Sequence, residues 1–370
     1  MVRFIKKSCL FFFLLLGSFN EAYGGIREQL CALDLLYSYQ FEQLDSVVDS
    51  LKAEEDTHII NFLNATKFWW YVSANPYKEN YYDELMSYTK RIVDGLSRQK
   101  VKSAHDYLLL GGAYGYWGRY YLLHDGWMSA YRFGKKGIHY LEQIPQDSEF
   151  YADAQFGIGI YRYYVGLLPQ YVKVLAFLLG FKGNREEGLD KLMFAKNDGV
   201  YSKVEAALFL AFIYIHFESN YPKAIEILES LQQKYPRNTQ ICILLSNAYI
   251  RSGKPGKAVQ VCEQLGGDGL ATFIDDVEAS EFQFTMGFAY QNNHEFNRAL
   301  AHYDLGEEKC QNEVIFQRAP WKFYQIACCY EMIQNDSQAI FYYQKVLECD
   351  DAFGFHEKAK EKLEQYQLAL

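Results

Sequence analysis

The chain has 370 residues, half of them hydrophobic and 17% aromatic, so it is long and apolar enough to bury extensive cores. Its formal charge of −9 comes without an evident basic stripe, which argues against nucleic acid as a partner. Only 7 prolines are present, and no Asn-Gly or Asp-Gly turn separates two alternating apolar runs. The composition therefore predicts an all-α protein.

The first 24 residues have the layout of a secretory signal peptide. Arg3, Lys6 and Lys7 form a basic start, residues 9–16 form an apolar run, and Ala22-Tyr23-Gly24 supplies small residues two apart. The apolar run is too short to span a bilayer. Cleavage after this stretch removes three basic residues and one acidic residue, so the net charge falls from −9 to −11. We expect export to the periplasm or cell envelope; an uncleaved anchor and a position near a membrane stay open.

The cysteines do not form a recognisable framework. Seven remain after removal of the leader, an odd number with no C-x-x-C pair: Cys31, Cys242, Cys262, Cys310, Cys328, Cys329 and Cys349. Most lie on apolar helix faces, which predicts small core residues. One disulfide among the C-terminal cysteines stays open for an exported chain.

Residues 25–201 have apolar side chains at helical spacing, which predicts an N-terminal region of divergent helical repeats. The expected helices cover residues 26–39, 41–53, 56–72, 80–96, 103–123, 126–143, 150–164 and 170–179, followed by a glycine-rich turn over 180–185 and a helix beginning at Arg185. Glycine is unfavourable inside a helix. The run around Gly111 and Tyr114 therefore indicates that another helix lies very close to this one.

Residues 202–370 repeat one pattern, in which a small residue is followed by Tyr, then by Ala, then by Cys or a bulky residue. This pattern is typical of the tetratricopeptide repeat, a helix–turn–helix unit whose small residues permit close contact. The copies are Ala211, Tyr214, Ala224 and Leu228; Ser246, Tyr249, Ala258 and Cys262; Gly287, Tyr290, Ala299 and Tyr303; and Ala327, Tyr330, Ala339 and Tyr343. The sequence predicts a tetratricopeptide-type helix-turn-helix solenoid.

Fixed positions on the first helix of each unit line the concave surface of such a solenoid. In this chain these positions include an apolar stripe of Ile243, Leu244, Phe284, Phe288, Trp321 and Tyr324, with Asn247 beside it and with Gln240, Glu281, Thr285, Gln325 and Cys328 at the remaining positions. Only Asn247 is of a type that clamps a peptide carboxylate. We expect a groove that binds an apolar helix or extended segment of a protein or peptide. The alternative is that the protein's own N-terminal helices fill this groove.

No motif for catalysis, a cofactor or a metal is evident. H-E-x-x-H, G-x-S-x-G and the phosphate-binding G-x-x-x-x-G-K pattern are absent, and the eight His residues are scattered. We therefore expect a protein that is not an enzyme and needs no cofactor. The second hypothesis is an exported receptor for a small ligand or glycan, with Trp rings as sugar platforms. Its candidates are Trp69, Trp70, Trp117, Trp127 and Trp321, of which the first four have apolar neighbours and are expected in the core.

The segment 167–189 carries a more specific pattern. Leu167-Leu168-Pro169 leads into an apolar helix, then Gly180-Phe181, Gly183-Asn184-Arg185 and Gly188-Leu189. This order resembles the tetratricopeptide repeat protein 39 family, which also includes the fungal inclusion body clearance protein of the mitochondrial outer membrane. Asn184 replaces the family's usual Asp, and Gln170 replaces a second Pro.

The resemblance implies an all-helical interaction protein with no catalytic residues. Known members are intracellular and lack a cleavable signal, so the N-terminus indicates a bacterial, exported relative. Within the segment, we expect Gly180, Gly183 and Gly188 to shape a turn and Arg185 to cap a helix or form an ion pair.

Overall fold

The fold is all-α, as the sequence predicts. The computed structural model describes residues 24–51, 57–124, 126–167, 183–267, 272–309, 319–351 and 354–369, which form 17 helices and no β-strand. The signal-peptide prediction, except for Gly24, and the helix expected over 170–179 lie outside the described residues. None of the described helices is both long and apolar enough to span a lipid bilayer.

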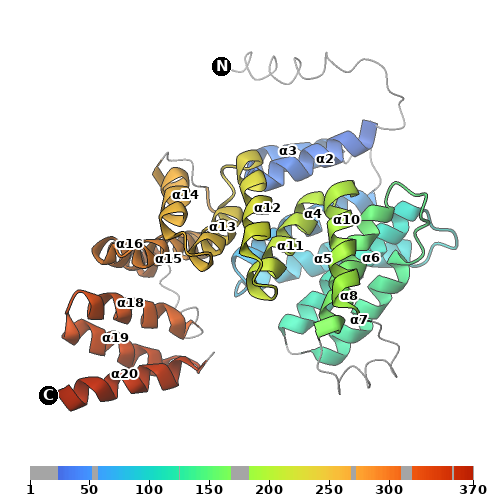
Figure 1. The fold of residues 1–370 in the computed structure, drawn as a ribbon. Coiled ribbons are helices and arrows are strands. Elements are labelled where there is room, and N and C mark those ends of the chain that lie inside the picture. The colour runs from blue at the N-terminus through green and yellow to red at the C-terminus, as the bar shows by residue number, and fades with distance from the viewer. Residues whose placement is uncertain are drawn as a thin grey trace, which may run out of the picture.

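The N-terminal region consists of antiparallel helical hairpins (Figure 1). Its helices are α2 (Gly24–Tyr37), α3 (Phe41–Leu51), α4 (Thr57–Ala74), α5 (Glu79–Leu96), α6 (Ala104–Leu123), α7 (Trp127–Leu141), α8 (Tyr151–Leu167) and α10 (Arg185–Asp198). The packed pairs are α2–α3, α4–α5, α6–α7 and α8–α10. The helices predicted within the described residues of this region are confirmed, with small differences at their ends.

The same organisation continues toward the C-terminus. The helices are α11 (Lys203–His216), α12 (Tyr221–Lys234), α13 (Thr239–Arg251), α14 (Pro255–Gly267), α15 (Asp276–Asn292), α16 (Phe296–Lys309), α18 (Pro320–Met332), α19 (Asp336–Glu348) and α20 (Phe355–Ala369). The first helices of successive hairpins touch, α11 with α13, α13 with α15 and α15 with α18, and α20 packs on α18 and α19. Hairpins stacked in this way form a solenoid. Because α10 also packs against α11, the hairpins run on past residue 201, and the boundary there stays a prediction.

The repeat positions form the seams between C-terminal helices. All four copies are buried apart from Tyr330, which is partly exposed. A Cβ added at Gly287 would lie only 2.6 Å from the ring of Tyr303. The small residue therefore lets the two helices of the unit touch, as the pattern predicts.

Between α6 and α7, glycines rather than the repeat residues allow the two helices to touch. A Cβ on Gly137 would lie 3.0 Å from the carbonyl oxygen of Gly111, and one on Gly118 would lie 3.3 Å from the amide nitrogen of Gly134. The predicted close approach to Gly111 is thus confirmed.

The prediction that Gly188 shapes a turn is wrong. It lies inside α10, where a Cβ would meet the backbone nitrogen of Tyr163 at 2.6 Å. Its role is to bring α10 against α8. Gly183 has a similar constraint, because a Cβ there would meet the backbone of Val165 at 2.4 Å. Gly180 lies outside the described residues.

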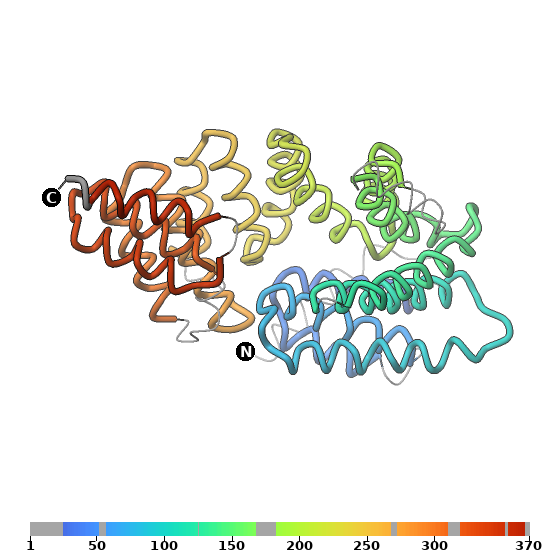
Figure 2. Tube along the Cα trace, turned by 90° about the horizontal axis from the view of Figure 1, so that it is seen from below, coloured from blue at the N-terminus to red at the C-terminus, as the bar shows by residue number. Residues whose placement is uncertain are grey.

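The N-terminal helices also contact the repeats far along the chain. Asn238 at the start of α13 donates to the carbonyl oxygen of Tyr37 at 2.8 Å, and Tyr235 donates to Asp34 at 2.6 Å. Figure 2 shows the consequence: the blue N-terminal helices lie near the middle of the molecule, and the red C-terminal hairpin forms one end. We call the part of the solenoid in which the N-terminal helices contact the repeats its closed part, and the part beyond these contacts its open part.

Candidate functional site

The predicted groove residues lie on three successive first helices. Ile243, Leu244 and Asn247 are on α13, Phe284 and Phe288 on α15, and Trp321 and Tyr324 on α18. All except Phe284 are partly exposed. Six of the seven are therefore placed where a partner could reach them, although whether they bind one stays a prediction.

Phe284 does not line an open surface, because its side chain is 0% exposed. Gly306 on α16 leaves room for the ring, since a Cβ there would approach it to 2.8 Å. The rings of Tyr303 and Trp321 lie at centroid distances of 5.5 and 6.4 Å from that of Phe284, and the Lys322 ammonium lies 4.3 Å from it. Phe284 is a core residue of the α15–α16 hairpin.

The two aromatic residues on α18 are also partly covered. The ring of Tyr324 lies 5.5 Å from that of Tyr343 and 5.4 Å from that of Phe355 on α20. Trp321 packs against the core through Phe284. The last helix thus narrows the accessible surface at the C-terminal end.

The chain's own N-terminal helices cover the other end of this surface. Gln240, one helical turn before Ile243, donates to the carbonyl oxygen of Trp70 on α4 at 3.3 Å. Trp70 in turn donates its indole N–H to Glu205 at 2.6 Å. Glu205 and Gln240 occupy equivalent positions of two repeats, because each lies the same number of residues before its repeat tyrosine, Tyr214 or Tyr249. At Gln240 and Glu205 the structure agrees with the alternative that the protein's own N-terminal helices fill the groove.

A buried carboxylate joins the same two parts of the molecule. Glu278 on α15, 1% exposed, accepts hydrogen bonds from the Tyr39 hydroxyl at 2.5 Å and the Ile274 backbone N–H at 2.7 Å. Burial is the main reason that the pKa of Glu278 rises to about 7, although these hydrogen bonds oppose the rise. Next to it, Asp275 accepts from Asn75 at 2.8 Å. These contacts fix the closed part of the solenoid.

Arg119 lies at the junction of α6 with α4 and α11. Its guanidinium carbon is 3.8 Å from the ring centroid of Trp69 and 6.0 Å from that of Phe209. Burial lowers the pKa of Arg119, and the nearby Glu205 charge opposes that shift. Burial likewise raises the pKa of the Glu205 carboxyl. The arrangement is a cation held between aromatic rings, which stabilises a junction between distant segments.

The start of α10 belongs to the 167–189 segment, and its side chains have a structural role. Asn184 caps α10 by accepting from the Glu187 N–H at 3.0 Å, a role that Asn and Asp share. Arg185 pairs with Glu218, as expected, and Tyr163 donates to the same carboxylate. Hydrogen bonding from Arg185 is the main reason that the pKa of Glu218 is lowered.

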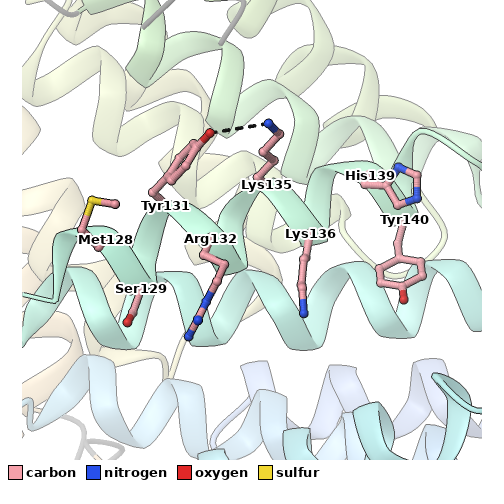
Figure 3. Close-up of a pocket in the computed structure, with 8 residues that line it drawn as sticks. All are labelled: Met128, Ser129, Tyr131, Arg132, Lys135, Lys136, His139 and Tyr140. Carbon is pink, nitrogen blue, oxygen red and sulfur yellow. Dashed lines mark hydrogen bonds between the residues drawn. The ribbon is translucent and has the colours of Figure 1, made fainter. Parts of the chain in front are cut away.

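The surface that the sequence reasoning missed lies on α7. A shallow recess there is lined by Met128, Ser129, Tyr131, Arg132, Lys135, Lys136, His139 and Tyr140 (Figure 3). Its basic side chains correct the expectation that the chain has no basic stripe. The signal was present in the sequence, because no Asp or Glu occurs over residues 126–141.

Trp127, at the start of α7, is 67% exposed, so its expected place in the core is wrong. The α6–α7 contact is made further along the helix, where Gly134 and Gly137 approach Gly118 and Gly111. Trp69 and Trp70 are buried as predicted, and Trp117 is partly buried, with its indole N–H donated to Thr89 at 2.7 Å.

The cysteines support the core prediction in part. Cys242, Cys262, Cys329 and Cys349 are buried, Cys328 is partly exposed, and Cys31 is exposed. None of these six forms a disulfide, and Cys310 lies outside the described residues. Among the residues that the structure describes, no group of three or more His, Cys, Asp or Glu side chains could hold a metal ion.

Comparison with solved structures finds helical-repeat proteins of low sequence identity. TTC0263, a thermophilic tetratricopeptide repeat protein of Thermus thermophilus, is 17% identical with a TM-score of 0.39, over 57% of this chain and 98% of that one. MamA from Desulfovibrio magneticus RS-1 is 11% identical with a TM-score of 0.36, over 48% and 91%. The APC/C hetero-tetramer Cut9-Hcn1 contains a chain 14% identical, with a TM-score of 0.49, over 86% of this chain and 59% of that one.

The family comparison is more specific. A search of the curated proteins finds no match. The model of the Iml2/Tetratricopeptide repeat protein 39 family matches residues 96–367, which is well over half of the chain and includes the 167–189 segment. The resemblance inferred from that segment is confirmed, and the chain belongs to the Iml2/Tetratricopeptide repeat protein 39 family.

Proposed function

We propose that the protein is a non-catalytic scaffold of the bacterial cell envelope that binds a protein or peptide. Its repeat architecture supports protein–protein interaction in general terms. The observation that carries the finer proposal is the row of partly exposed side chains on α13, α15 and α18, including Ile243, Phe288 and Trp321. This row follows the open part of the solenoid, beyond the end that α4 covers. An apolar helix or extended segment fits such a row.

The envelope location rests on the N-terminal pattern alone. A basic start, an apolar run and small residues two apart are typical of a Sec-type leader. Cell fractionation of the full-length chain, with mass spectrometry of its N-terminus, tests this part. Recovery of an intact N-terminus in the cytosol would contradict it.

Site-specific photo-cross-linking tests the docking surface. A photoreactive side chain in place of Phe288 is expected to capture a partner in living cells. The matched control is Phe341 on α19, which is 47% exposed and lies outside the proposed row. Equal capture from both positions, or capture from Phe341 alone, would show that the row is not the docking surface.

A glycan receptor is the alternative function, and the exposure of Trp127 is the observation that favours it. Exposed aromatic rings stack against sugars. A glycan array probed with the parent protein and with Trp127→Ala distinguishes this function from protein binding. An array without hits leaves the scaffold as the better proposal.

A further inference from the structure

The outward face of α7 carries a stripe of positive charge. Arg132, Lys135, Lys136 and His139 are exposed or partly exposed and recur at helical spacing, over about 10 Å of helix. Residues 126–141 contain no Asp or Glu, although acidic residues outnumber basic ones by 46 to 37 in the chain. The stripe is therefore a local positive region on an acidic protein.

The cations of this stripe lie over aromatic rings. Arg132 is 4.9 Å from the ring centroid of Phe133, and Lys136 is 5.4 Å from that of Tyr114. In the described part of the chain, no carboxylate forms an ion pair with Arg132, Lys135 or Lys136. Their charge is available to another molecule, because a ring contact leaves most N–H donors of a cation unused.

Exposed apolar side chains flank the start of the stripe. Trp127 is 67% exposed and Met128 79%, and at the end of α6 Leu122 and Leu123 are 46% and 57% exposed. Grouped exposure of large apolar side chains marks interaction surfaces on soluble proteins. Trp beside Arg is also the composition of a binding hot spot.

We propose that this α7 face, defined by Met128, Arg132, Lys135, Lys136 and His139 with Trp127 at its end, docks an acidic segment of a partner protein that also carries apolar residues. The inference rests on the proposed scaffold function and names the chemistry of a partner. Carboxylates of the segment pair with the stripe, and its apolar side chains cover Trp127 and Met128.

The geometry favours a narrow segment over a membrane surface. Figure 3 shows Arg132 and Lys136 pointing to one side of α7 and Lys135 to the other, so that the cations flank a recess. A flat bilayer would instead need the charged and apolar groups to protrude together on one side. Nucleic acid is disfavoured because the stripe offers few phosphate contacts on a chain with a net charge of −9.

The test uses the full chain and a fluorescein-labelled helical peptide. The peptide carries Glu residues at the spacing of the stripe with Leu residues beside them, and a matched peptide has Gln in place of Glu. The protein variant is Lys135→Glu with Lys136→Glu. The control is Lys358→Glu with Lys360→Glu, which makes the same charge change at exposed positions on α20. Fluorescence anisotropy gives the affinities, and circular dichroism checks that the variants fold.

The acidic peptide is expected to bind the parent protein, and the α7 variant is expected to bind it at least about tenfold more weakly. The α20 control is expected to change affinity by less than about twofold. Trp127→Ala supplies a second variant, with a several-fold loss expected. Equal binding of the Glu and Gln peptides, equal loss in both charge variants, or no peptide binding would overturn the proposal.

Two further probes separate other classes of partner. Binding to phosphatidylglycerol-containing vesicles or to an oligonucleotide, together with no binding of the acidic peptide, would overturn the proposal in favour of that class. The scaffold proposal can fail independently. If cross-linking at Phe288 captures a partner while the α7 variant binds the acidic peptide as the parent does, only the α7 inference fails.

Discussion

The α6–α7 and α15–α16 hairpins reach close helix contact by different means. Between α6 and α7, backbone touches backbone at Gly111 and Gly137. Between α15 and α16, Gly287 receives the large ring of Tyr303. The charges differ as well: Arg298 on α16 pairs with neighbouring carboxylates, whereas the α7 cations lie over rings. The same hairpin architecture thus carries two kinds of surface. On α16 the charge of Arg298 is paired within the protein, whereas on α7 the cations are available to another molecule.

The largest expected effect contrasts two aromatic residues that the sequence pattern misplaces. Phe284→Ala is expected to lower the free energy of unfolding by about 3–5 kcal/mol, because the ring is fully buried and leaves a cavity. Trp127→Ala is expected to change it by less than about 0.5 kcal/mol, since the side chain is 67% exposed. Urea unfolding measures both. Similar midpoints for the two variants would mean that these burial assignments are incorrect.

A smaller effect is expected from the carboxylate that holds the closed part of the solenoid. The pKa of Glu278 is raised from 4.5 to about 7, so the folded state binds its proton more tightly than the unfolded state does. This contribution to stability is fully present below pH 4.5 and is lost as the pH rises through about 7. It amounts to something on the order of 3 kcal/mol.

Glu278→Gln isolates this contribution because Gln stays neutral throughout. The difference in unfolding free energy between parent and variant is expected to change between pH 4.5 and 8, in the direction that favours the parent at low pH. Glu357→Gln, at an exposed position on α20, serves as the control. Parallel pH curves for the parent and Glu278→Gln would rule out the raised pKa.

The smallest effect compares two glycines inside helices. Gly188→Ala is expected to destabilise the fold by about 1–3 kcal/mol, because its Cβ would meet the Tyr163 backbone at 2.6 Å. Gly134→Ala is expected to stabilise it by about 0.5–1 kcal/mol, since a Cβ there meets nothing within 4 Å and Ala favours the helix. Thermal unfolding measures both shifts, and a loss of stability in Gly134→Ala would contradict the contrast.

Much of the fold could be predicted because helical periodicity is a local property. The helix expected over 80–96 is observed over Glu79–Leu96, and the one expected over 126–143 over Trp127–Leu141. Residues such as Ala258 and Tyr290 were placed in the seams by their spacing alone, and both are buried. The site was harder to predict. Phe284 and Phe288 occupy equivalent-looking groove positions, yet Phe284 is buried because residues of neighbouring helices surround it, among them Gly306, which leaves room for its ring.

The sequence by itself determined the all-α class, the hairpin repeat, the family and the absence of acidic residues from α7, since each of these depends on residue types at fixed spacing. Tertiary structure alone decided that α4 covers the surface at Gln240, and that Trp127 at the start of α7 is exposed. The physical reason is that exposure depends on which helix lies opposite. A helix has the same periodicity whether its partner comes from the next hairpin or from 170 residues away.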